Sequence, residues 1–119
     1  MSTMLSSITG FHVHIYFEYD AADAARSLCT KAAELFGVAM GHAHARAVGP
    51  HPMPSCQLDC SPEQFGRLLP WLMENRGDLI VFCHAQSGDH LTDHTRNTFW
   101  LGEPQTLNLE MFGQISQTH

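Results

Sequence analysis

The segment from Phe11 to Glu18, FHVHIYFE, constrains the fold more than any other part of the chain. It alternates with a period of two and is rich in β-branched and aromatic residues, which is typical of a strand. One set of alternate side chains is expected to face the core: Val13, Ile15 and Phe17. The other set shares the open face of the sheet: His12, His14 and Tyr16. A slip of one residue in the strand pairing would bury both imidazoles under the helices, so the register is well specified.

Two amphipathic helices are expected, the first of them from Ala21 to Phe36. Asp20 is its predicted N-cap and Gly37 its predicted end, because a short acceptor side chain and a glycine favour these positions. The expected apolar stripe of this helix consists of Ala24, Leu28, Ala32 and Leu35.

The second helix is expected from Ser61 to about Asn75. Ser61 is the predicted N-cap, Pro62 suits the first helical position, and Gln64 stands where a capping box requires it. Its expected core residues are Phe65, Leu68, Leu69 and Leu72. Pro70 lies inside the segment and should kink the helix.

Three further strands are expected, from Val38 to Val48, from Met53 to Cys60 and from Leu79 to His84. The first of these has the weakest pattern, and it would carry His42, His44 and Arg46 on one face, exposed to solvent. The remainder, Ala85 to His119, is expected to be loop-rich, with a short strand near Leu107 to Met111.

The element order β-α-β-β-α-β is that of a ferredoxin-like fold. We therefore predict the α+β class, with a four-stranded antiparallel sheet, two helices on one face and a loop-rich C-terminal extension. Residues 1–10 are a short polar lead. Residues 11–119 are expected to form a single domain, since a chain of 119 residues has single-domain size.

The strand order expected for this fold brings several histidines together. The fourth, first, third and second strands would lie side by side, with the first and third parallel and the fourth antiparallel to the first. His12 begins the first strand, His84 ends the fourth, and His51 precedes the third. These three would converge at one end of the sheet, with His14 one pleat further along.

The loop that leaves the fourth strand adds His94 and two carboxylates, Asp89 and Asp93, near the same end. Clustered imidazoles with a carboxylate nearby suit Fe(II), Mn(II) or Zn(II). The H-x-H spacing of His12 and His14 is weak evidence by itself, because hydrogen-bonded histidines on a half-buried sheet face would show the same spacing. The convergence with other histidines favours a metal or catalytic site.

Charge and composition exclude several classes of protein. Twelve acidic residues against six basic ones give a net charge of −6, which argues against nucleic-acid binding. The longest apolar run, Leu79 to Cys83, is far shorter than the ~20 residues of a membrane span. Residues 1–10 contain no Lys or Arg and no apolar stretch, so we expect no secretory signal and a cytoplasmic protein. The four cysteines form no CxxC pair and are expected to be reduced core residues.

Several short motifs, in order from about Phe11 to Leu109, resemble the DOPA 4,5-dioxygenase family. They are HVHIYF at 12–17, VGPHP at 48–52, PWL at 70–72, NRG at 75–77, the strand ending at His84, SGD at 87–89, DHT at 93–95 and WLG at 100–102. The sequence departs from the family pattern at Cys83, Ala85 and His90, which would alter the pocket or the surroundings of a metal.

This resemblance implies an extradiol dioxygenase that opens the ring of a catechol such as L-DOPA, using dioxygen and non-haem Fe(II). Zn(II) and Mn(II) are alternatives. The implied metal ligands are His12, His14 and His84, although His51 or a carboxylate could replace one of them.

The same resemblance implies acid/base roles for neighbouring residues. His51 or His94 would deprotonate the catechol and later return a proton, since an imidazole pKa near ~6.5 suits both tasks around neutral pH. Asp93 would orient His94 or bind the metal, and Tyr16 is a candidate acid or hydrogen-bond donor.

Two alternatives remain open. One is a non-catalytic, dimeric module that binds a metal or a small ligand, whose metal site would be closed by four protein ligands. The other is an oxygen-independent metal enzyme on the same scaffold, such as a Zn(II) hydrolase or isomerase. In each case we expect a homodimer, because the broad sheet face and the aromatic C-terminal segment need cover.

Overall fold

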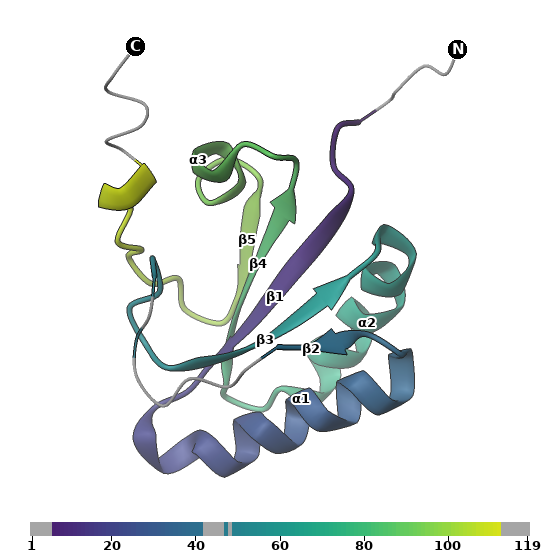
Figure 1. The fold of residues 1–119 in the computed structure, drawn as a ribbon. Helices are drawn as coiled ribbons and strands as arrows, with labels where there is room; N and C mark the ends of the chain where they lie inside the picture. Colours follow the sequence, from purple (N-terminus) through teal and green to yellow (C-terminus); the bar gives the residue numbers. More distant parts are fainter. Residues whose placement is uncertain (1–5, 42–46, 48, 113–119) are drawn as a thin grey trace.

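A five-stranded antiparallel sheet with two helices packed on one face organises the chain (Figure 1). The computed structural model describes residues 6–41, 47 and 49–112. Its elements are β1 (Gly10–Tyr16), η1 (Tyr19–Ala21), α1 (Ala22–Phe36), β2 (Ala39–Met40), β3 (Ser55–Cys60), α2 (Pro62–Asn75), β4 (Ile80–Gln86), α3 (His90–Asp93) and β5 (Thr98–Leu101). The α+β class and the β-α-β-β-α-β order are as expected. The sheet order is β2-β3-β1-β4-β5.

The prediction of four strands is wrong, because the C-terminal region adds β5 at the edge of the sheet. Residues 98–101 pair antiparallel with β4, with Thr98 opposite His84 and Trp100 opposite Phe82. The strand expected near Leu107 to Met111 is absent from those described residues, and residues 110–112 form a helical turn instead.

The predicted parallel pairing of the first and third strands is also wrong. β1 pairs antiparallel with β3, and β3 pairs antiparallel with β2. The crossover through α1 therefore makes β1 and β2 parallel, and β3 fills the gap between them. As a result, the start of β1 lies beside the end of β3, with Phe11 opposite Cys60.

α1 begins later than predicted and is rotated relative to the predicted stripe. Its N-cap is Ala21, whereas Asp20 lies in η1. The buried residues are Ala25, Leu28, Cys29 and Ala32, a regular i, i+3, i+4, i+7 stripe. The predicted members Ala24 and Leu35 are exposed. The prediction left out Cys29, which is buried in the middle of the observed stripe and shifts the centre of the buried face away from Ala24 and Leu35. Gly37 ends the helix with φ of 68°, as expected.

α2 follows its predicted capping box. The Ser61 hydroxyl accepts a hydrogen bond from the Gln64 backbone at 3.1 Å, and the Gln64 side chain accepts one from the Ser61 backbone at 2.9 Å. Phe65, Leu68 and Leu72 are buried, and the helix continues through Pro70 to Asn75.

The remaining strand boundaries differ from the predicted ones. β3 starts at Ser55 rather than Met53, and β4 runs to Gln86 rather than His84. In the described part of the second strand, pairing covers Ala39–Met40. The predicted positions of His42, His44 and Arg46 lie outside the described residues.

The core lies between the helices and one face of the sheet. Val13, Ile15 and Phe17 belong to it, which confirms the predicted register of β1. All four cysteines are buried. The expectation that they are all reduced is wrong in this structure, because Cys29 of α1 and Cys56 of β3 form a disulfide. Among the described helices, none has the length and apolar character that crossing a bilayer requires.

Candidate metal centre

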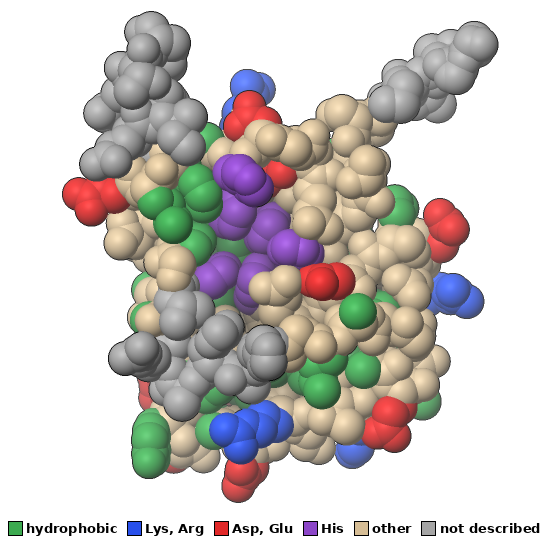
Figure 2. Space-filling view, viewed as in Figure 1, with side chains coloured by type: hydrophobic (Ala, Val, Ile, Leu, Met, Phe, Trp, Pro, Cys, Tyr) green, Lys and Arg blue, Asp and Glu red, His purple; other side chains and the backbone are tan. Residues whose placement is uncertain are grey.

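The sheet face opposite the helices carries a cluster of histidines (Figure 2). Alternation along β1 places His12, His14 and Tyr16 on this face, and β4 adds Phe82 and His84. His12 and His84 are direct cross-strand partners, as the predicted strand order required. Two neighbouring strands therefore supply three imidazoles to one place.

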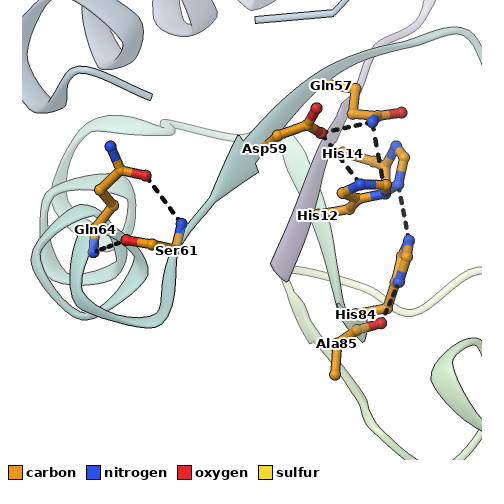
Figure 3. A network of polar contacts seen from close by, with 8 residues as sticks. All are labelled: His12, His14, Gln57, Asp59, Ser61, Gln64, His84 and Ala85. Carbon is orange, nitrogen blue, oxygen red and sulfur yellow. Dashed lines mark hydrogen bonds and ion pairs between the residues drawn. The ribbon is translucent and has the colours of Figure 1, made fainter. Parts of the chain in front are cut away.

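His12, His14 and His84 each offer a nitrogen atom, and these atoms lie within 4.8 Å of one another. The Nε2 atoms of His14 and His84 are 3.2 Å apart (Figure 3). Nitrogen ligands of one ion, each at ~2.1 Å, are separated by roughly 3 to 4 Å. The His14–His84 pair already has this spacing, and a His12 nitrogen lies within 4.8 Å of both. The three histidines therefore fit a divalent transition-metal ion.

Hydrogen bonding orients the His84 ring for this role. Its Nδ1 donates to the backbone oxygen of Ala85 at 2.9 Å. The lone pair is consequently on Nε2, the atom that faces His14. Ligating histidines in metal sites are commonly held in this way.

Burial keeps these imidazoles neutral. Desolvation lowers the pKa of His14 well below its usual value, and the neighbouring His51 and His84 lower it further. Desolvation also lowers the pKa of His84 to about 4, against a weaker raising effect of its bond to Ala85. Because a metal binds neutral imidazole, both rings have the charge state that ligation requires at neutral pH.

His12 has two polar neighbours on β3 that the sequence reasoning missed. Its Nε2 lies 3.2 Å from Asp59 Oδ1, and its Nδ1 lies 3.5 Å from Gln57 Nε2 (Figure 3). Gln57 also donates to Asp59 at 2.7 Å. Burial lowers the pKa of His12, while the charges of Asp59 and Asp93 partly offset that effect. The alternation of apolar and polar residues in 56–60 could have indicated that Gln57 and Asp59 share the face opposite the core.

His51 reaches the cluster by a route that differs from the predicted one. Since β3 starts beside the end of β1, the loop before it lies near Tyr16 and not near His12. The Tyr16 hydroxyl and His51 Nδ1 form a hydrogen bond of 2.7 Å, and the ring centroids of His51 and His14 are 4.0 Å apart. Burial raises the pKa of Tyr16, so the phenol keeps its proton and donates it to Nδ1.

His94 closes the other side of the cluster, with its ring 4.1 Å from that of His84. Its Nδ1 donates to the backbone oxygen of His90 at 2.7 Å. Desolvation lowers the pKa of His94, and the nearby Asp93 charge raises it. The buried Asp93 carboxylate accepts hydrogen bonds from the Ser87 backbone at 2.8 Å and hydroxyl at 2.6 Å. Among the described hydrogen bonds, Asp93 is therefore tied to Ser87 rather than to His94.

These side chains line a pocket of about 410 Å³. Its lining consists of Thr9, His12, His14, His51, Gln57, His84, Gln86, Gly88, His90, Asp93 and His94. Aromatic rings pack against its histidines: the ring centroids of Phe82 and His84 are 5.6 Å apart, and Phe112 stacks on His94 at 4.6 Å. Phe82 in turn lies 4.5 Å from Trp100. A larger cavity of about 600 Å³ lies beside α1 and the end of α2, but none of the described residues that line it is a histidine. The chemistry therefore points to the smaller pocket.

Comparisons with known proteins agree with this arrangement. The sequence model of the Dopa 4,5-dioxygenase family matches residues 11–111. A DOPA 4,5-dioxygenase from Amanita muscaria is 30% identical over 119 aligned residues, covering 92% of this chain and 52% of that protein. An uncharacterized 21.2 kDa protein from Botryotinia fuckeliana is 35% identical over 78 residues, covering 59% of this chain and 43% of that protein. The chain thus spans about half the length of these curated relatives.

A solved structure is similar over nearly its full length. The crystal structure of a "putative dioxygenase" from Nostoc punctiforme has a TM-score of 0.89 and 34% sequence identity. The match covers 96% of this chain and 99% of that one.

Proposed function

The chain belongs to the Dopa 4,5-dioxygenase family, and from this premise we propose that it is a metal-dependent dioxygenase that opens the ring of a catechol by extradiol cleavage. L-DOPA is one candidate substrate. The observation that carries the proposal is the set of three histidines whose donor atoms lie within 4.8 Å of one another in a pocket of about 410 Å³.

His12, His14 and His84 would hold the metal, for which we propose Fe(II), with Mn(II) and Zn(II) as alternatives. A metal held there would supply Lewis-acid stabilisation of the negative charge that develops on the catechol oxygens and dioxygen. The three histidines contribute neutral nitrogen donors at neutral pH, because burial lowers the pKa values of all three.

The number of ligands supports catalysis over a structural or storage site. Among the described residues, three histidines have ligand atoms close enough to one another to share a metal ion. A structural zinc site is closed by four protein ligands, whereas a catalytic site keeps positions open for reactants. This observation favours an enzyme over the non-catalytic binding module.

His51 and His94 flank the three ligands and are the proposed acid/base residues. Tyr16 donates its hydrogen bond to His51 Nδ1 at 2.7 Å, which leaves the His51 proton on Nε2. His94 has the reverse arrangement, since its Nδ1 donates to His90 and its Nε2 carries the lone pair. One ring is thus prepared to give a proton and the other to accept one. Asp93 favours protonation of His94 through its charge.

Aromatic side chains packed against the pocket histidines would fix the shape of the space. Phe82 lies against Trp100 and within 5.6 Å of the His84 ring, measured between centroids. Phe112 stacks on His94 from the C-terminal segment. A catechol ring would lie against the imidazoles that line the pocket, and the aromatic rings packed behind them would hold these imidazoles in place.

Homodimer formation is a further part of the proposal. β2 and β5 are edge strands of the described sheet, and Phe99 of β5 is 36% exposed. An edge strand with an exposed aromatic residue is a surface that another chain can cover. A monomeric mass by light scattering at micromolar concentration would contradict this part.

Oxygen consumption tests the proposed reaction. The protein is loaded with Fe(II) under anaerobic conditions and mixed with oxygenated buffer and L-DOPA, catechol or other substituted catechols, while the visible spectrum is recorded. We expect oxygen uptake that depends on both protein and iron, together with a yellow ring-opened product. Fully loaded protein that consumes no oxygen with any catechol would refute the dioxygenase. Turnover without oxygen would favour the alternative metal enzyme.

A further inference from the structure

We propose that Asp59 is a positioning residue, which holds the proton of His12 on Nε2 and thereby directs the Nδ1 lone pair of His12 toward the other two histidines. The inference rests on the metal site proposed above. It assigns a role to a carboxylate outside the histidine cluster, on β3.

Sheet register brings Asp59 to this position. Asp59 is the cross-strand partner of His12, and Gln57 is the partner of His14. Residues at alternate positions share a face, so both side chains lie on the histidine side of β3. Directly opposed residues are close enough for a side-chain contact that needs no movement of the backbone.

The two nitrogens of His12 have chemically different neighbours (Figure 3). A carboxylate can only accept hydrogen bonds, so the 3.2 Å contact with Asp59 Oδ1 requires a proton on Nε2. A neutral ring carries one proton, which leaves the lone pair on Nδ1. The assignment of the tautomer therefore follows from the acceptor on one side of the ring.

Gln57 supports the same assignment. Its amide nitrogen donates to Asp59 at 2.7 Å, and this acceptor determines which way the amide is turned. The same nitrogen lies 3.5 Å from His12 Nδ1, where its second proton meets a lone pair. That contact is long and weak, so a metal ion can replace it at little energetic cost.

His84 shows the same design with a different acceptor. A backbone oxygen holds its proton on Nδ1 and leaves the lone pair on Nε2. His12 depends instead on a side chain, and this acceptor can be removed by mutation. Since the Asp59 side chain is 46% exposed, its replacement should leave the fold intact.

Metal affinity measures the proposed role without requiring turnover. Co(II) is titrated anaerobically into the full-length protein, and its absorption spectrum gives the Kd. Loss of a hydrogen-bond partner of a ligating histidine typically weakens metal binding about 10- to 100-fold. We expect this loss for Asp59→Ala and a smaller one for Asp59→Asn, because the amide oxygen still accepts. Glu74→Gln, which removes an exposed charge on α2, is the matched control and should bind as the wild type does.

A double-mutant cycle separates positioning from a general effect of charge. If Asp59 acts through His12, Asp59→Ala should cause no further loss of the weaker Co(II) binding of His12→Ala, which is titrated at correspondingly higher metal concentrations. An equal loss in both backgrounds, or unchanged affinity of Asp59→Ala, would overturn the inference while leaving the proposed function standing. Wild-type protein that binds no metal would instead refute the proposed function, and the inference with it.

Nitrogen NMR of the metal-free protein gives a second measurement. We expect the His12 ring of the wild type to carry its proton on Nε2, and the two tautomers to mix in Asp59→Ala. A wild-type ring protonated on Nδ1 would contradict the proposal whatever the affinities are.

Discussion

The Nε2 atoms of His14 and His84 lie 3.2 Å apart, although the two residues are separated by 70 positions in the chain. Because His84 uses its proton at Nδ1, its Nε2 is the acceptor and His14 Nε2 is the donor in the metal-free protein. A metal ion between the two rings would replace this single proton. The contact therefore marks where we expect the ion to bind.

Loss of either ring should weaken metal binding strongly. We expect His14→Ala and His84→Ala to weaken Co(II) binding by more than about 100-fold and to remove oxygen consumption, since two ligands hold a divalent ion poorly. Glu74→Gln is the control, because Glu74 is exposed on α2 and does not line the pocket. Equal affinities in all three variants, measured by spectroscopic titration, would contradict the assigned ligands.

The stability of the metal-free protein should fall as the pH is lowered from about 6.5 to about 4. Burial lowers the pKa of His84 to about 4, so the unfolded chain binds its proton first and acid favours unfolding. The contribution of this one residue is on the order of 3 kcal/mol. Urea unfolding at several pH values measures it.

A variant assigns that pH dependence to His84. In His84→Gln the fall in unfolding free energy between these pH values should be smaller, because one buried titrating group is gone. Met73→Gln, at an exposed position on α2, removes no titrating group and should keep the wild-type slope. The same slope in His84→Gln and wild type would show that other groups cause the acid sensitivity.

Tyr16→Phe should lower the turnover number while leaving metal affinity within about twofold. The phenol orients His51 and does not belong to the ligand set, so its removal should cost about 10²-fold or more in kcat if His51 moves a proton. The lost hydrogen bond should also lower the unfolding free energy by about 1 kcal/mol. Tyr19→Phe is the control, because that ring is 93% exposed. Unchanged kcat in Tyr16→Phe would exclude the proposed relay.

Reduction of the Cys29–Cys56 disulfide should lower stability without changing the metal site. The bond spans 27 residues, which corresponds to about 3.5 kcal/mol by loop entropy. Metal affinity should be unaffected, because the disulfide joins α1 to the core face of the sheet. Thiol titration of the unfolded, non-reduced chain should give two thiols, Cys60 and Cys83. Four thiols would mean that the bond does not form in the isolated protein.

Local sequence patterns determined the buried face of β1 and the start of α2. Alternation in FHVHIYFE predicted which face of β1 is buried, and the capping box predicted the start of α2, because both depend on residues within one turn or one pleat. The family motifs predicted the family as well. The same alternation placed His12 and His14 on one face before any strand pairing was known.

Pairing between distant segments was decided by the tertiary structure. β3 runs antiparallel to β1, so His51 arrives from the Tyr16 end, and the direction of a neighbouring strand is not encoded in the period of either strand. β5 forms because Thr98–Leu101 pairs with the free edge of β4. The alternation within this segment is too weak to predict that pairing from the sequence. The partnership of Asp59 with His12, and of Cys29 with Cys56, likewise depends on which surfaces meet. Periodicity is a property of neighbouring residues, whereas register and partner choice are properties of the whole chain.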